Sequence, residues 1–222
     1  MRFLMLYGVN CTNKVWDYLK PYLSEYEIDY VEYPHEITRK AKEVTDISEW
    51  VHENYHHHYY EAIIGHSLGG IIALQLAVKY KMRFGKLIYL DTNLKPANEF
   101  YRNLMTPEHM NEFGESIISM FQEESKFYTP ALFESIQGEY DYTNYLKEIT
   151  QKVYAIYGDR NKSEYSDKVS DLNLSREALE KIELKFINNA CHMIMIENPR
   201  QLYITIKDIL EDNCFISEPI SM

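Results

Sequence analysis

The alternation of short apolar runs with segments of helical periodicity constrains the fold of this chain more than any other feature. Six runs of three to seven residues are typical of buried strands: residues 3–7, 28–33, 62–64, 86–91, 152–158 and 183–188. Parallel strands need long crossover connections, and helices supply these while covering the sheet. The sequence therefore predicts an α/β fold, with a mostly parallel sheet of about six strands and helices on both faces.

The connecting segments carry helix signals. Apolar residues recur at helical spacing, with polar caps at several starts, and predict helices over residues 12–23, 45–55, 71–80, 175–182 and 198–213. Asp46 and Glu49 have the spacing of a capping box, and Ser175 is a candidate N-cap. The last of these segments is amphipathic and should close the chain against the sheet.

Residues 95–150 interrupt this alternation. They contain helix starts at Thr106-Pro107 and Thr129-Pro130 and a helix stop at Gly138, but no convincing strand. They are also rich in Phe, Tyr and Met. We expect a helical insertion between the fourth and fifth strands, within a single domain over residues 1–222.

Composition narrows the possible partners. A net charge of −11 argues against binding to nucleic acid or to anionic lipid surfaces, because phosphate groups need a basic face. No apolar run approaches the roughly 20 residues of a membrane span. The leading run over residues 3–7 is too short for a signal peptide. We therefore expect no membrane or nucleic-acid partner.

The cysteines and histidines give little sign of a metal or disulfide site. Cys11, Cys191 and Cys214 are widely spaced and odd in number, which argues against a disulfide framework and favours a reducing, cytoplasmic location. The three histidines at 56–58 are consecutive, and adjacent positions do not share a helix face. A three-ligand metal site there is not expected.

The segment Gly65-His66-Ser67-Leu68-Gly69 has the pattern G-x-S-x-G between a predicted strand and a predicted helix. A sharp turn at that junction forces the serine into a strained conformation and lifts its hydroxyl off the end of the sheet. The flanking glycines let the strand and the helix approach closely. This context favours an exposed nucleophile at Ser67 over an incidental serine in a tight turn.

Nearly the whole chain resembles the α/β-hydrolase superfamily. Gly8-Val9, with Trp16 and Leu19 downstream, resembles the oxyanion loop of that family, although Tyr7 replaces its usual His. The ending "CHMIMIENPRQL" resembles the family's "GH…E-x-P", with Cys191 in place of Gly. The resemblance implies that Ser67 is the nucleophile, that His192 is the base, and that the backbone N–H groups of Val9 and Leu68 form the oxyanion hole.

Further implications concern the rest of the architecture. By the same resemblance, the helical insertion at about 95–150 is a lid, and neither a metal nor an organic cofactor is implied. Because the first predicted strand is the one that precedes the oxyanion loop, we do not expect the two or so antiparallel strands that usually lead the family's sheet. His192 also follows the last strand directly, at the carboxyl edge where sites of α/β sheets assemble.

The carboxylate that should orient His192 is not settled by the sequence. The family usually places it as G-x-x-D, but the segment here reads Gly158-Asp159-Arg160-Asn161, with Asn161 at the acid position. Asp91 is the first alternative, because pancreatic lipases place their acid after the same strand. Asp159 is the second, and Asn161, acting as an uncharged orienting group, is the third.

These features predict a serine hydrolase that acts on a small-molecule carboxylic ester or thioester through an acyl-enzyme on Ser67. The aromatic insertion suggests an apolar acyl or aryl substrate. Acyl transfer and carbon–carbon bond hydrolysis use the same triad and stay open. A non-catalytic ligand-binding protein on a hydrolase scaffold is the rival hypothesis, motivated by Asn161.

Overall fold

The computed structural model describes residues 1–211 of the 222-residue chain. Six strands form one parallel sheet in the order β2-β1-β3-β4-β5-β6. They are β1 (Arg2–Leu6), β2 (Glu27–Tyr30), β3 (Tyr60–His66), β4 (Phe84–Leu90), β5 (Lys152–Gly158) and β6 (Ile182–Ile187). The predicted parallel α/β sheet is confirmed; β5 has the expected bounds, and the ends of the other strands differ from the expected ones by one to three residues.

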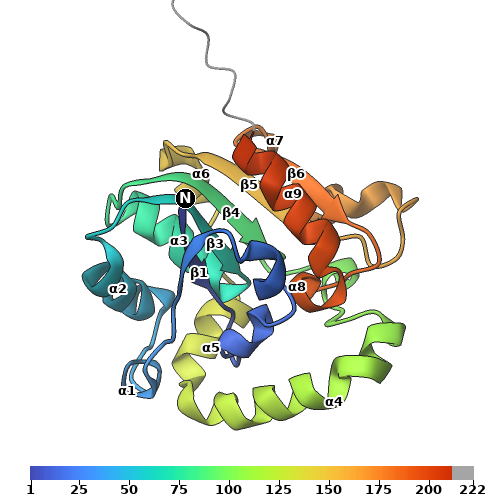
Figure 1. The fold of residues 1–222 in the computed structure, drawn as a ribbon, viewed down its shortest axis with the longest axis horizontal. Helices are drawn as coiled ribbons and strands as arrows, with labels where there is room; N and C mark the ends of the chain where they lie inside the picture. Colours follow the sequence, from blue (N-terminus) through green and yellow to red (C-terminus); the bar gives the residue numbers. More distant parts are fainter. Residues whose placement is uncertain (212–222) are drawn as a thin grey trace, which may run out of the picture.

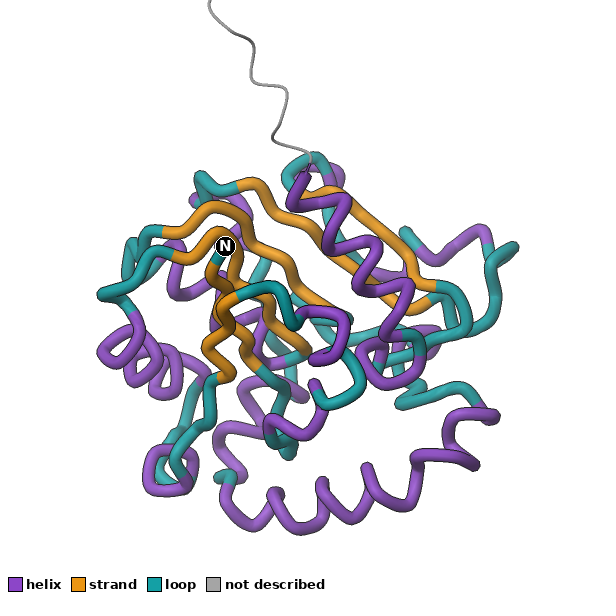
Figure 2. The backbone as a smooth tube through the Cα atoms, viewed as in Figure 1, coloured by secondary structure: helices purple, strands orange, loops and turns teal. Residues whose placement is uncertain are grey.

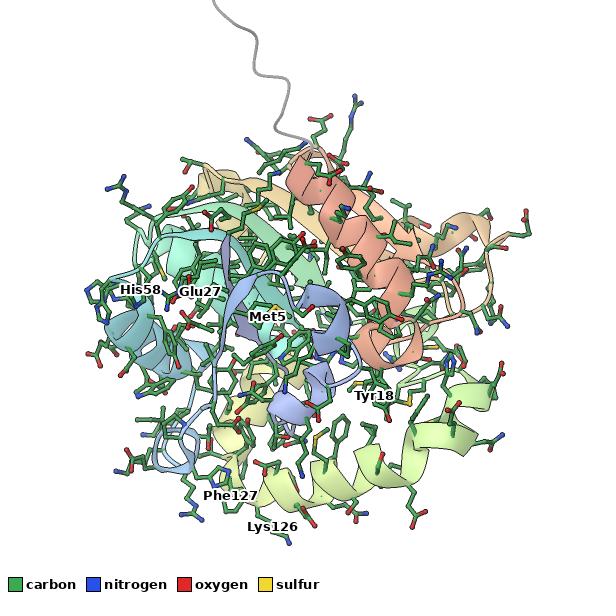
Figure 3. All side chains as sticks on the ribbon, in the orientation of Figure 1. Met5, Tyr18, Glu27, His58, Lys126 and Phe127 are labelled. Atoms are coloured by element: carbon green, nitrogen blue, oxygen red, sulfur yellow. The ribbon has the colours of Figure 1, made fainter. Side chains whose placement is uncertain are left out.

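The sheet is buried because its central strands are apolar on both faces. Pairing aligns Met5 with Ile64, Ile64 with Ile88, and Ile88 with Tyr154, and all four side chains are fully buried. Met5 lies deep among the strands in Figure 3. This continuous apolar character is typical of a parallel sheet covered on both sides.

Nine α-helices occur in the described part of the chain. They are α1 (His35–Thr38), α2 (Val44–Tyr55), α3 (Leu68–Val78), α4 (Pro107–Glu124), α5 (Pro130–Gln137), α6 (Asn144–Glu148), α7 (Arg176–Leu179), α8 (Ile194–Glu197) and α9 (Pro199–Glu211). Figures 1 and 2 show α9 across one face of the sheet and α3 on the other. Residues 212 and 213 of the predicted final helix, and Cys214, lie outside the described residues.

Two helix predictions need correction. Residues 12–23 form two short 3₁₀ helices, η1 (Asn13–Trp16) and η2 (Lys20–Leu23), and not one helix. Pro21 explains the break, because it lacks a backbone N–H to continue a helical ladder. The second predicted helix begins at Val44, with Glu43 as its N-cap and Asp46 closing the capping box, so the expected Asp46–Glu49 pairing is wrong.

The segment between β4 and β5 contains α4, α5 and α6, and Figure 1 shows α4 lying well away from the strands. Thr106 and Thr129 cap α4 and α5 through their hydroxyls, and α5 ends before Gly138, as the sequence predicts. Within residues 1–211, none of the helices combines the length and the hydropathy needed to cross a bilayer.

Candidate active site

Ser67 stands at the turn from β3 into α3 with φ 53° and ψ −119°, a backbone conformation that residues other than glycine rarely adopt. Two hydrogen bonds hold it there: its N–H donates to the Leu90 carbonyl over 3.0 Å, and Thr92 Oγ1 donates to its carbonyl over 2.9 Å. Surrounding structure therefore maintains the strain that exposes the hydroxyl.

The glycines beside Ser67 are required by close backbone approach. A Cβ on Gly65 would lie 2.3 Å from the Gly69 carbonyl oxygen, and one on Gly69 would lie 2.2 Å from the Leu6 carbonyl oxygen. Both distances are far inside van der Waals contact. Small residues at these positions let α3 start directly against β1 and β3, which is the reason for the G-x-S-x-G pattern.

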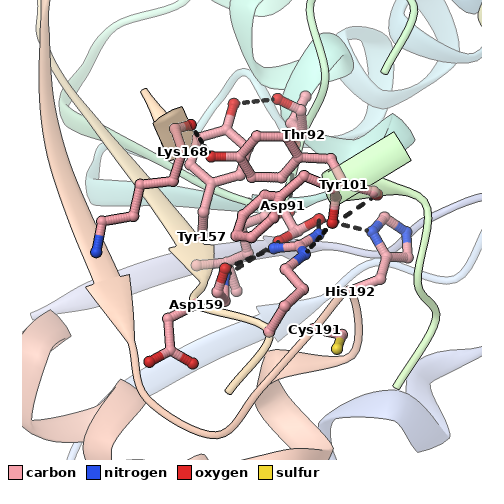
Figure 4. Close-up of polar contacts among 12 residues, drawn as sticks. Asp91, Thr92, Tyr101, Tyr157, Asp159, Lys168, Cys191 and His192 are labelled. Atoms are coloured by element: carbon pink, nitrogen blue, oxygen red, sulfur yellow. Dashed lines mark hydrogen bonds and ion pairs between the residues drawn. The ribbon is translucent and has the colours of Figure 1, made fainter. Parts of the chain in front are cut away.

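His192 lies in the loop between β6 and α8, with its ring partly exposed. Its backbone N–H donates to the Leu104 carbonyl over 3.0 Å, and His66 Nε2 donates to its carbonyl over 3.0 Å. Its Nδ1 lies 3.1 Å from Asp91 Oδ1, and Figure 4 shows the two side chains facing each other. A ring that donates from Nδ1 keeps Nε2 free to accept a proton.

Asp91 follows β4 directly and is fully buried, with φ 42°. Besides His192 it accepts hydrogen bonds from Arg160, 2.7 Å to each carboxylate oxygen, and from Gly158 N–H over 3.1 Å. Burial by itself would raise the pKa of Asp91. The Arg160 charge and the bonds from His192 and Arg160 outweigh burial and hold this pKa well below its usual range. Asp91 is therefore ionised.

The other two candidate acids are engaged elsewhere. Asp159 Oδ1 accepts from the backbone N–H groups of Asn161 and Asn189, at 2.8 and 2.9 Å, and so bridges two loops. Figure 4 shows the Asp159 carboxylate pointing away from His192. Asn161 is exposed. Of the three alternatives, Asp91 alone has a carboxylate within hydrogen-bond distance of the His192 ring.

Arg160 is the site residue that sequence reasoning missed. All five N–H groups of its guanidinium donate: two to Asp91 and one each to the carbonyls of Gly158, Phe100 and Tyr101. Its side chain is 1% exposed. The available signal in the sequence was that Arg160 directly precedes Asn161, which stands at the family's usual acid position. Only the fold shows that Arg160 reaches Asp91, at the end of the neighbouring strand β4.

Val9 and Leu68 both lie beside Ser67. A Cβ on Gly8, just before Val9, would stand 2.9 Å from Ser67 Cβ, so this loop passes directly over the serine. Leu68 is the first residue of α3, where backbone N–H groups lack a helical acceptor and can bind an anion. Val9 and Leu68 thus belong to two separate elements that adjoin Ser67, and both line the same cavity as the serine.

His66 packs against His192, with ring centroids 4.7 Å apart. Burial, reinforced by the neighbouring His192, lowers the pKa of His66 to about 3. His66 is therefore neutral near pH 7 and acts as a hydrogen-bond donor to the His192 loop.

One cavity of about 620 Å³ joins these elements and is large enough for a small molecule. Its lining includes Val9, Ser67, Leu68, Asp91 and His192. The helical insertion contributes further lining residues: Phe121, Ile136, Gln137 and Tyr140. Most aromatic residues of the insertion are packed elsewhere; Phe113, for example, stacks edge-on against Tyr18, 5.2 Å between centroids.

The described residues contain no group of three His, Cys, Asp or Glu side chains placed to hold a metal ion. The consecutive histidines lie at the edge of the molecule, where Figure 3 shows His58 pointing outward.

Comparison with known proteins gives one family match and many similar folds. The model of the Esterase family, described as "Putative esterase", matches residues 42–153. No curated protein matches the sequence. A hydrolase from Oleispira antarctica has a similar structure (TM-score 0.76, 14% identity, 96% of this chain and 91% of that one).

Two further solved structures are similar. MenH from S. aureus superposes with a TM-score of 0.72 at 13% identity, covering 96% of this chain and 94% of that one. A thermophilic esterase from Thermogutta terrifontis gives 0.69 at 15% identity, covering 96% and 90%. At such low identities these likenesses show a shared fold.

Proposed function

Because this chain belongs to the Esterase family and is an ester hydrolase of the α/β-hydrolase superfamily, we propose that it cleaves a carboxylic ester or thioester through an acyl-enzyme on Ser67. The observation that carries the proposal is the hydrogen bond between His192 and buried, ionised Asp91, in the cavity that the strained Ser67 also lines. This combination supplies a nucleophile, a base and an orienting anion.

In the proposed reaction, Ser67 Oγ attacks the acyl carbon while His192 Nε2 takes its proton. Asp91 holds the tautomer that leaves Nε2 free, and its charge stabilises the imidazolium. The N–H groups of Val9 and Leu68 bind the oxyanion. His192 then protonates the leaving alcohol or thiol, and water releases the acid by the same steps in reverse.

The acyl or aryl group occupies the part of the cavity lined by Ile71, Phe121 and Ile136, which favours an apolar acid moiety of a small molecule. In this proposal the helical insertion serves as the lid, because it supplies two of these residues from α4 and α5. The contact of Asp91 with His192 supports this proposal over the non-catalytic hypothesis, which was motivated by Asn161.

The experiment that tests the proposal combines labelling with kinetics. A fluorophosphonate probe should label the wild-type protein at Ser67 and leave Ser67→Ala unlabelled. Ser67→Ala and His192→Ala should each lower turnover of p-nitrophenyl esters roughly 10⁴-fold, and the double variant should be little worse. Ester turnover that survives in Ser67→Ala would refute the acyl-enzyme. Esters of increasing chain length, with acyl-thioesters alongside, then define the substrate class.

A further inference from the structure

Arg160 is a buried cation that the proposed chemical steps do not use. Its guanidinium lies at the carboxyl end of β5, donates to both oxygens of the Asp91 carboxylate, and stands over the aromatic ring of Tyr101, whose centroid is 4.6 Å from Cζ. Isolated buried charges are strongly unfavourable, so a cation at this depth has to be matched closely. Arg160 forms a bidentate ion pair with Asp91, whose carboxylate also accepts the hydrogen bond from His192.

The two oxygens of the Asp91 carboxylate accept different sets of hydrogen bonds. Oδ1 accepts from His192 Nδ1 and from one Arg160 nitrogen, whereas Oδ2 accepts from the other Arg160 nitrogen and from Gly158 N–H. A forked pair of this kind fixes the plane of the carboxylate as well as its position. The direction in which Asp91 presents Oδ1 to the imidazole is therefore set by Arg160.

The charge of Arg160 also changes the electrostatic potential that Asp91 exerts on the His192 ring. A carboxylate that stands alone beside an imidazole strongly favours the imidazolium form, because opposite charges attract in a poorly solvated site. A carboxylate already paired with a guanidinium carries much less net negative potential toward the ring. The neutral imidazole is the form that can accept a proton from Ser67.

We propose that Arg160 is a positioning residue of the reaction: it aims Asp91 at His192 and offsets its charge, so that His192 stays an available base at lower pH than Asp91 alone would permit. This inference rests on the proposed function, because it assigns His192 the role of base. It adds to that function a residue outside the Ser-His-Asp set that determines the pH range of activity.

The other titratable and charged groups around His192 do not replace Arg160. They are His66 at the end of β3, Tyr101 and Arg102 before α4, Tyr140 after α5, Asp159 after β5, Cys191 beside the ring, and Glu197 in α8. Burial raises the pKa of Cys191 and of Tyr140 to about 12 and raises that of Tyr101, so all three are uncharged at neutral pH.

The remaining groups are neutral or already engaged. His66 is neutral because its pKa is lowered to about 3. Glu197 accepts from the backbone N–H groups of Thr106 and Cys191, and Asp159 from those of Asn161 and Asn189. Arg102 donates to the Ala97 carbonyl. Arg160 is the group whose charge reaches His192 through the shared Asp91 carboxylate.

Two substitutions separate the charge from the geometry. Arg160→Gln removes the positive charge, so the acidic limb of the kcat/KM profile for a p-nitrophenyl ester should move up by about 1–2 pH units. Arg160→Lys keeps the positive charge but cannot form the two parallel hydrogen bonds to Asp91. The acidic limb of its kcat/KM profile should therefore stay within about 0.5 pH units of wild type, whereas kcat on the pH plateau should fall roughly tenfold or more with KM nearly unchanged. Arg176→Gln removes an exposed arginine paired with Glu180 and serves as the matched charge control.

The outcomes are distinct. An unmoved limb in folded Arg160→Gln would overturn the charge role, and full plateau kcat in Arg160→Lys would overturn the positioning role. Circular dichroism and thermal melting establish that each variant is folded. If Arg160→Gln does not fold, Arg160→Lys decides the proposal through its kcat. Fluorophosphonate labelling of Ser67 in the wild-type protein keeps the two proposals apart: absent labelling counts against the proposed function, whereas normal labelling with unchanged Arg160 variants counts against this inference alone.

Discussion

Substituting Asp91 by Asn tests the site most directly, because the change is isosteric and the structure defines its consequence. Both carboxylate oxygens accept two hydrogen bonds: Oδ1 from His192 and Arg160, Oδ2 from Arg160 and Gly158. An amide has one accepting oxygen and one donating NH₂ group. Whichever way the amide of the Asp91→Asn variant is turned, its NH₂ faces two donors, and Arg160 is left without a buried counter-charge.

Asp91→Asn should lower both the folding stability and the turnover number. Breaking a buried ion pair on one side costs about 3–5 kcal/mol of folding free energy, which for a chain of this size lowers the melting temperature by roughly 10 °C. Turnover should fall by about 10⁴-fold, close to 5 kcal/mol of transition-state stabilisation, since His192 loses both its tautomer preference and its charge partner.

The assay is p-nitrophenyl ester hydrolysis at a temperature where both proteins are folded. Asp159→Asn is the matched control, because Asp159 Oδ1 accepts from the N–H groups of Asn161 and Asn189, a task that an amide oxygen can also perform. Turnover in that variant should stay within about tenfold of wild type. If Asp91→Asn keeps turnover within tenfold while Asp159→Asn loses it, Asp91 is not the orienting acid.

Two further predictions concern the cavity wall and the acid stability. Phe121→Ala enlarges the cavity and should shift the preferred chain length of the ester substrate. Phe113→Ala, on the same helix but packed on Tyr18, should lower thermal stability and leave this preference unchanged. Equal shifts of the preferred chain length in both variants would show that the cavity does not set the preference. The pKa of His66 is lowered from 6.5 to about 3 in the folded protein, so between these two pH values the unfolded chain binds a proton at His66 and the folded chain does not. The free energy of unfolding therefore falls as the pH drops from 6.5 toward 3, by up to about 1.4 kcal/mol per pH unit. His66→Gln keeps a donor for the His192 carbonyl and should make the fall of melting temperature between pH 6 and 4 shallower; an unchanged slope would contradict the assignment.

Much of the fold followed from local signals. The apolar runs predicted six strands because a parallel sheet buried on both faces requires uninterrupted apolar sequence. The least accurate predictions were local boundaries, such as the split of residues 12–23 at Pro21 and the start of α2 at Val44, because competing caps lie only a few residues apart.

The sequence by itself indicated that Ser67 and His192 would lie at one edge of the sheet: Ser67 follows β3 directly, His192 lies in the loop after β6, and parallel strands bring their carboxyl ends to one edge. It left the acid open among Asp91, Asp159 and Asn161, which all follow the neighbouring strands β4 and β5 at that same edge. Only the tertiary structure decided which of these side chains turns toward His192. The physical reason is that Asp159 finds backbone donors close to it, whereas buried Asp91 finds Arg160 and His192 from strands distant in sequence.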